Sequence, residues 1–400
     1  MTKAAGIQSV IRGDQTGFRD RIPILEKLSP EFYAQEKEKI FRRAWLCVAH
    51  TSDLPEKGGY RVVEVPTFRA SLLIVRDKEG GIRGFHNICR HRGNKLVRGG
   101  IGTKTNFACG FHGWAWSAKG DLTLVPDEAQ FQNLPKDELG LIPIHTEVWE
   151  GFVFVNFDKA PRTTLREWIG EMYGEFAGYF DGKEKLTRYQ VEVNCNWNMA
   201  LGAFIEGYHT KYLHRLTAPD YQGGRSNPHR HRPLIETLER HTRYSAPRNP
   251  DHVATPAEIA AYKYGRKLTP AFDNDNTGLP PGVNPLRSDT WAFDVVKLFP
   301  NLVMLNSNSW HLAIWFWPVD ETRTVIRAER LFYKAKNAGE RFGQAFSKVR
   351  AREVLREDLN TLEATQDALM SGMMEHIYLS QQELPIQHHF KVAEDMIAQP

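Results

Sequence analysis

The chain contains 400 residues, and its 52 lysine and arginine residues against 48 aspartate and glutamate residues give a formal charge of +4. This excess is too small to indicate a nucleic-acid-binding protein, and a composition of 41% hydrophobic and 25% charged residues excludes a disordered or fibrous chain. The mean hydropathy of −0.47 predicts no membrane span, and the first residues lack the apolar core of a signal peptide. We therefore expect a cytoplasmic protein without a membrane partner.

The four cysteines are too few for a disulfide framework. Cys47 and Cys195 have no patterned neighbours and are expected to be buried thiols. Cys89 and Cys109 each stand close to a histidine, which indicates metal binding.

The expected elements divide the chain into three regions. Residues 1–45 form an N-terminal segment that ends in a helix over 29–45, where Ser29 can cap the first turn. Residues 46–160 hold short alternating runs between glycine-rich turns, which predicts a small antiparallel β domain. The third region, residues 161–400, is expected to contain helices over 165–180, 196–215 and 341–369, strands over 189–193 and 295–334, and loops over about 220–292. The predicted class is α+β.

Two cysteine–histidine pairs in the β region form the pattern C-x-H-x17-C-x2-H, with Cys89, His91, Cys109 and His112. A zinc site would need all four ligands on one ion in a tetrahedron. A Rieske [2Fe–2S] cluster needs two cysteines on one iron and two histidines on the other, with one of each from each loop. The mixed pairs favour the Rieske cluster, and zinc stays the alternative.

The sequences around these pairs, NICRHRG over 87–93 and CGFHGW over 109–114, resemble the cluster loops of Rieske non-haem iron oxygenase α (oxygenase) subunits. The resemblance implies a Rieske domain over 46–160 and a catalytic domain over 161–400. The catalytic domain would have an antiparallel sheet flanked by helices, of the helix-grip or START-like type. The segment 1–45 would pack on that catalytic domain.

An oxygenase with such a cluster needs a second centre that binds dioxygen, and two histidines with one carboxylate on Fe(II) provide it. His209 and His214 are candidates for the two histidines. Five residues apart in a regular helix, they would point about 140° away from each other. We therefore expect either a widened helical turn or a second histidine just past the end of a helix.

The third ligand is expected on the helix over 341–369. Asp358 lies within an apolar stripe of that helix, where a carboxylate is costly unless it is paired or binds a metal. Glu357 and Glu363 lie outside the stripe and are expected to face solvent. Asp358 followed by Gln366 is also similar to the third-ligand helix of the family.

The stretch before the histidines is similar to the iron-binding motif of the same family, with Tyr208 among the matching positions. Gly202 and Ala203 replace the usual Glu-Asn pair, and Glu206 replaces the usual bridging aspartate. The resemblance implies that Glu206 bridges the mononuclear site to a cluster histidine, His112, of a neighbouring subunit for electron transfer, and that Tyr208 belongs to the catalytic site. Family members with glutamate here include quaternary-ammonium mono-oxygenases.

The resemblance implies the terminal oxygenase component of a Rieske system. Such an enzyme is a homotrimer that uses O₂ to hydroxylate, dihydroxylate or oxidatively demethylate a small aromatic or other hydrophobic substrate. Because the chain has no G-x-G-x-x-G or flavin motif, NAD(P)H electrons would come from a flavin/iron–sulfur reductase, with or without a ferredoxin. The alternatives are a mono-oxygenase of a quaternary-ammonium compound and, in a different class, a stand-alone Rieske electron-transfer protein.

Overall fold

The computed structural model describes residues 10–221, 233–264, 278–308 and 310–400. The chain divides into two compact units. The first unit combines the residues up to Ile40 with Ile169–Pro400, and the second comprises Phe41–Trp168.

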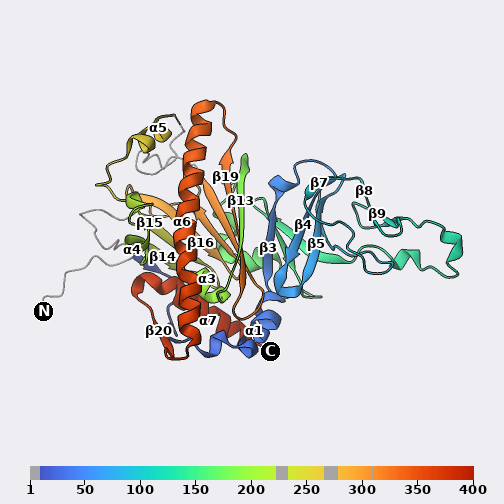
Figure 1. Ribbon diagram of the computed structural model, residues 1–400, viewed down its shortest axis with the longest axis horizontal. Helices are drawn as coiled ribbons and strands as arrows, with labels where there is room; N and C mark the ends of the chain where they lie inside the picture. The colour runs from blue at the N-terminus through green and yellow to red at the C-terminus, as the bar shows by residue number, and fades with distance from the viewer. Residues whose placement is uncertain (1–9, 222–232, 265–277, 309) are drawn as a thin grey trace. The chain divides into compact units, whose positions relative to one another are not determined.

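The second unit is an antiparallel β domain, as predicted (Figure 1). Its seven-stranded sheet has the order β3-β12-β11-β6-β5-β4-β7, made of β3 (Trp45–His50), β4 (Gly59–Val65), β5 (Ala70–Arg76), β6 (Ile82–His86), β7 (Ile101–Thr103), β11 (Pro143–Trp149) and β12 (Phe152–Asn156). A three-stranded sheet of β8 (Asn106–Ala108), β9 (Ala115–Ser117) and β10 (Leu122–Leu124) has the order β10-β9-β8. Apolar residues of both sheets, among them Leu73, Phe107 and Trp116, form one core with Cys89 and Cys109.

The first unit is built on an eight-stranded sheet in the order β1-β14-β15-β16-β17-β18-β19-β13. The strands are β1 (Val10–Arg12), β13 (Lys183–Val193), β14 (Leu234–Thr237), β15 (Thr242–Pro247), β16 (Trp291–Leu298), β17 (Leu302–Asn306), β18 (His311–Pro318) and β19 (Thr324–Tyr333). All neighbouring pairs are antiparallel except β1 and β14, so the sheet is mixed at one edge. A small ladder joins β2 (Arg21–Pro23) to β20 (His376–Tyr378).

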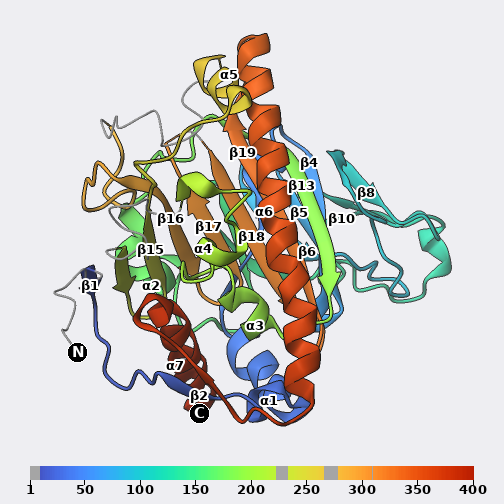
Figure 2. The same cartoon turned by 60° about the vertical axis from the view of Figure 1, so that its left-hand side comes forward.

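One long helix, α6 (Ala338–Met370), crosses a face of this sheet (Figure 2). Asn337 caps it by accepting a hydrogen bond from the backbone N–H of Glu340 at 2.9 Å. Its buried residues recur every three or four positions, as helical periodicity requires: Gly343, Ser347, Ala351, Leu355, Asp358, Leu362, Gln366 and Leu369. At 33 residues the helix is roughly 50 Å long, so one rigid element serves distant parts of the unit.

The other helices are short. They are α1 (Pro30–Gln35), α2 (Leu165–Ile169), α3 (Trp197–Gly202), α4 (Thr210–Leu213), α5 (Pro256–Tyr264) and α7 (Leu384–Ala398). In Figure 2, α3 and α4 lie beside α6, and α7 contacts β14 and β15. None of the helices in the described ranges is both long and apolar enough to cross a membrane.

Four expectations about elements were wrong. The helix expected over 165–180 is α2 followed by a 3-10 helical segment over Gly170–Gly174 and then by turns. The helix capped by Ser29 ends at Phe41, after a π-helical segment, and Trp45 begins β3. The region 220–292 contains two strands and α5 where loops were expected, and the parts of it at 222–232 and 265–277 lie outside the described residues. The expected helix over 196–215 is two short helices with a break between them.

The buried thiols were predicted correctly, since Cys47 and Cys195 are both free of disulfides and buried. Burial raises the pKa of the Cys195 thiol to about 12. Such a thiol stays protonated and unreactive near neutral pH.

Candidate metal centres

The two cysteine–histidine loops of the β domain have the same backbone arrangement. In the first loop, the N–H of Cys89 donates to Asn94 and its carbonyl accepts from Gly93, at 2.7 and 3.0 Å. In the second loop, Cys109 makes the equivalent bonds with Trp114 and Gly113 at the same two distances. Both glycines have φ near +75°, which is a conformation that glycine adopts without strain. The two loops are therefore a matched pair of tight turns.

The side chains of these loops fit a Rieske cluster. Cys89 and Cys109 are 3% and 4% exposed, whereas His112 is exposed and its ring centroid lies 4.7 Å from that of His91. Asn94 Nδ2 lies 3.5 Å from Cys109 Sγ, and hydrogen bonds to sulfur tune such clusters. Two buried thiols and two outer imidazoles are the donors that a [2Fe–2S] centre with one cysteine-bound and one histidine-bound iron requires.

A tetrahedral zinc site does not fit these four residues. Among the described residues, one set of at least three histidine, cysteine, aspartate or glutamate donors has all its ligand atoms within 4.8 Å of one another, and it lies elsewhere. The four donors of the β domain thus do not converge on a single point, as zinc ligands must.

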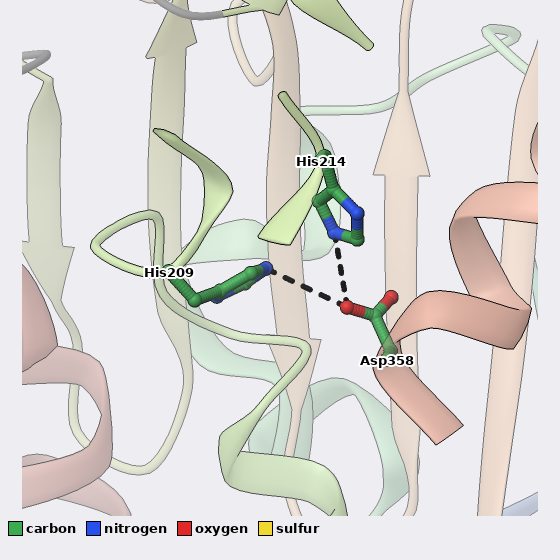
Figure 3. A group of neighbouring side chains, drawn as sticks. All are labelled: His209, His214 and Asp358. Carbon is green, nitrogen blue, oxygen red and sulfur yellow. Dashed lines mark ion pairs between the residues drawn. The ribbon is translucent and has the colours of Figure 1, made fainter. Parts of the chain in front are cut away.

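The converging set consists of His209, His214 and Asp358 (Figure 3). The two histidines flank the single-turn helix α4, where the N–H of Leu213 donates to the His209 carbonyl and the N–H of His214 donates to that of Thr210. The prediction of a second histidine just past the end of a helix is therefore confirmed, and no π-helical turn is needed.

Gly207 lies in the break between α3 and α4, close to the Tyr244 side chain. A Cβ atom at this position would lie 2.1 Å from the Tyr244 hydroxyl oxygen. A larger residue at this position would have to push the Tyr244 side chain aside.

The three donors meet at one buried oxygen. Asp358 Oδ1 lies 3.6 Å from His209 Nε2 and 3.0 Å from His214 Nε2 (Figure 3). The Asp358 side chain is 6% exposed, and none of the described residues donates a hydrogen bond to Oδ1. A buried carboxylate oxygen without a donor is costly. A divalent cation between the oxygen and the two ring nitrogens would remove that cost, so the residues fit a mononuclear iron site.

The other nitrogen of each ring is held by a carboxylate. Nδ1 of His209 donates to Glu206 Oε1, and Nδ1 of His214 donates to Glu357 Oε2 at 2.7 Å. The Thr217 hydroxyl donates to the same Glu357 oxygen. Such partners fix the tautomer, so that each Nε2 presents its lone pair to a metal.

The expectation that Glu357 faces solvent was wrong, because its side chain is 27% exposed and orients a histidine. Its contacts come from His214 and Thr217, some 140 residues away in the sequence, so helical periodicity alone had no signal for them. Glu363 is exposed as expected, although its Oε1 accepts from the backbone N–H of Asn194.

Tyr208 contributes to this site through its backbone. Its ring is 51% exposed, and its N–H donates to Glu206 Oε2. The second Glu206 oxygen is thereby held in place, while the first contacts His209.

A mainly apolar cavity adjoins the three donors. It contains about 920 Å³ of space between atoms, open solvent at its mouth included. The aromatic residues that line it are Phe204, Tyr221, Tyr262, Phe293, Trp310 and Phe346. His209, His214 and Asp358 also line it, so a molecule held in the cavity would reach the metal ligands.

Comparison with family models identifies both parts of the chain. Residues 44–135 match the model of the Rieske [2Fe–2S] domain. Residues 180–399, more than half of the chain, match the model of the ring hydroxylating alpha subunit (catalytic domain).

Individual relatives differ in the compounds for which they are named. Over 202 residues the chain is 32% identical to chloroplastic choline monooxygenase from Beta vulgaris, covering 48% of this chain and 44% of that protein. Over 184 residues it is 35% identical to the alpha subunit of biphenyl 2,3-dioxygenase from Rhodococcus jostii, covering 44% and 39%. The matched segments thus span less than half the length of these relatives.

Solved structures share the fold. A quaternary ammonium Rieske monooxygenase bound to an inhibitor aligns with a TM-score of 0.74 and 22% identity, over 93% of this chain and 94% of that one. The aligned part of the chain includes residues of both units, so each unit has a counterpart of similar fold in that structure. The chain belongs to the family of ring-hydroxylating Rieske oxygenase alpha subunits, with a Rieske [2Fe–2S] domain followed by the catalytic domain.

Proposed function

We propose that the protein is the terminal oxygenase component of a Rieske oxygenase system. It uses O₂ and NAD(P)H electrons, delivered by a flavin/iron–sulfur reductase with or without a ferredoxin, to hydroxylate, dihydroxylate or demethylate a small hydrophobic substrate. The observation that carries this proposal is the set of three metal donors at an apolar cavity, in a chain that also carries the cluster loops.

Each group of residues has a separate task in this proposal. Cys89, His91, Cys109 and His112 hold the [2Fe–2S] cluster, while His209, His214 and Asp358 hold one Fe(II). With both groups bound, the cluster supplies single electrons and the mononuclear iron supplies a centre for activating dioxygen.

The side chains that line the cavity bind the substrate. The aromatic and aliphatic ones bind the body of the substrate and exclude water from the reacting carbon. Glu206 and Glu357 keep both imidazoles in the tautomer that binds metal.

Glu206 is also proposed as the bridge for electron transfer to His112 of a neighbouring subunit in a homotrimer. A second, more open depression is lined by Glu206, His209, Tyr212, Leu213 and Thr361. The Tyr212 side chain beside it is 65% exposed. An apolar rim around a carboxylate that already holds a metal ligand is a suitable docking place for another subunit's imidazole.

A quaternary-ammonium mono-oxygenase is the second candidate. It is supported by the relative named for choline, by glutamate at position 206 and by the aromatic residues of the cavity, which can bind a cation over their faces. A stand-alone electron-transfer protein has no such support, because it would leave His209, His214 and Asp358 without a task.

Metal analysis and oxygen uptake test the proposal. Anaerobically reconstituted protein is expected to hold three irons for two sulfides, with a Rieske absorption spectrum. With a reductase and NADH, it should consume O₂ when a substrate from a panel of aromatic, steroid-like and quaternary-ammonium compounds is present. Two irons for two sulfides, with no uptake on any compound, would indicate an electron carrier, and zinc without sulfide would overturn both readings.

A further inference from the structure

The cavity wall contains a buried arginine with which no carboxylate of the described residues forms an ion pair. Arg330, on β19, lines the cavity and is 5% exposed. Its Nη2 donates to the Ser347 hydroxyl at 2.6 Å, and its buried Nε has no hydrogen-bond partner. In the described part of the chain, no aspartate or glutamate forms an ion pair with it. Burial lowers the pKa of Arg330 to about 10, so the group is still a cation at neutral pH.

Arg350, the second arginine of the cavity, is paired with a carboxylate, as buried arginines usually are. Both of its Nη atoms donate to the buried carboxylate of Asp220, and its Nε donates to the carbonyl of Thr217. Its charge is therefore balanced within the protein. Arg330 lines the same cavity from β19, but no carboxylate in the described ranges pairs with it.

An unbalanced buried cation costs several kcal/mol unless an anion joins it. The planar guanidinium group presents its N–H donors as a fork that matches a carboxylate. We propose that the substrate of this oxygenase is an acid whose carboxylate binds Arg330, at the end of the cavity away from the metal ligands. This inference rests on the proposed function and assigns a substrate class to it.

Helix α6 separates the arginine from the metal donors along one wall of the cavity. Ser347, which bonds Arg330, and Asp358, which is a metal donor, both line the cavity and are eleven residues apart on this helix. At 1.5 Å per residue they are separated by about 16 Å along the helix axis. The α6 residues that line the cavity between them include Ala351, Val354 and Leu355, which are apolar. An elongated acid with an apolar body therefore fits this separation better than a carboxylate attached directly to a benzene ring.

The same contacts disfavour a cationic group at this end. The Arg330 guanidinium lies 4.3 Å from the Trp310 ring centroid, and that of Arg350 lies 4.8 Å from the Tyr221 ring centroid. Each ring thus already has a cation over it. A quaternary ammonium group would have to displace an arginine or accept repulsion from Arg330.

Binding measurements on one carbon skeleton test this inference without any turnover. The probes are phenylhexanoate, phenylhexanamide and trimethyl(phenylhexyl)ammonium, titrated calorimetrically into protein of known iron content. The carboxylate is expected to bind wild-type protein at least about tenfold more tightly than the amide, as a charge-assisted hydrogen bond allows. Equal affinity of acid and amide, or preference for the ammonium ion, would overturn the proposal.

Two substitutions locate the effect. Arg330→Gln keeps a side chain near Ser347 and is expected to weaken carboxylate binding about 10- to 100-fold, with amide binding unchanged. Arg352→Gln removes the same charge from the exposed face of α6, where the side chain pairs with Glu353, and should leave both affinities unchanged. Equal losses in the two variants would refute a specific site.

Arg330→Lys and the ligand series on wild-type protein keep the test decisive if Arg330→Gln does not fold. Lysine keeps the charge without the fork, so it should retain part of the preference for the acid. Circular dichroism and Tm identify any variant that does not fold, in which case the wild-type ligand series decides. If amides or ammonium compounds bind and drive O₂ uptake while acids do neither, the oxygenase assignment stands and this inference fails.

Discussion

Replacing Glu357 with glutamine is expected to loosen the mononuclear site without changing any of its three donor atoms. Glu357 contacts Nδ1 of His214 and the hydroxyl of Thr217, and it donates nothing to the metal position itself. Glutamine has nearly the same shape but no charge, and its amide nitrogen is a poor neighbour for a ring N–H. The imidazole then loses its fixed tautomer and part of its basicity.

The magnitude follows from the role of such partners. Losing a carboxylate behind a ligating histidine typically costs 10–100-fold in metal affinity, which is about 1.4–2.8 kcal/mol. The effect on folding should be smaller, about 1 kcal/mol or less, because the Glu357 side chain is 27% exposed and solvent replaces part of the interaction.

The assay is an anaerobic ferrous-ion titration of protein whose cluster has been reconstituted. Glu353→Gln is the matched control, since Glu353 lies one turn earlier on α6 and, among the described residues, pairs only with Arg352 and Arg356. Weaker iron binding in Glu357→Gln alone, with the cluster spectrum unchanged, is the expected result. Wild-type affinity in Glu357→Gln would refute the claim that this carboxylate orients His214.

The remaining predictions concern other parts of the molecule. Asp358→Asn removes the charged donor and should abolish ferrous binding in equilibrium dialysis, whereas an intact iron content would refute its role. Cys109→Ser should remove the Rieske spectrum and leave ferrous binding at His209 measurable. Burial raises the pKa of Glu36 to about 7 from the ordinary 4.5, so its contribution to stability is fully present below pH 4.5 and is lost as the pH rises through 7. That loss is about 3 kcal/mol. Urea unfolding should therefore show wild-type stability falling relative to Glu36→Gln between pH 5 and pH 8, and a constant difference would contradict the buried-carboxyl explanation.

The sequence was most informative where the chemistry is local. Each cluster loop carries its cysteine and histidine within four residues, so the pattern survives without knowledge of the fold. Asp358 could also be predicted as a ligand from the sequence. A carboxylate inside an apolar helical stripe is costly to bury unless it binds a cation or a hydrogen-bond donor.

Sequence patterns failed where polar groups satisfy one another across the fold. Every residue of β14 and β15 is buried, yet these strands contain Glu236, Arg243 and Ser245. Arg243 pairs with Glu236, and Ser245 donates to Asp294 on β16. The polar composition of these segments predicted loops. The partners that allow the polar side chains to be buried become visible only in the folded chain. Glu357 was missed for the same reason.

Helix α6 makes the two ends of the cavity independently variable. Its first half holds Ser347 and its second half holds Asp358, and apolar cavity-lining positions, Ala351, Val354 and Leu355, lie between them. A bulkier residue at Ala351 would shorten the chamber, and a smaller one at Leu355 would widen it, with the reactive centre unchanged. Point substitutions along this one stripe are therefore a direct way for evolution, or an engineer, to change the shape of the cavity.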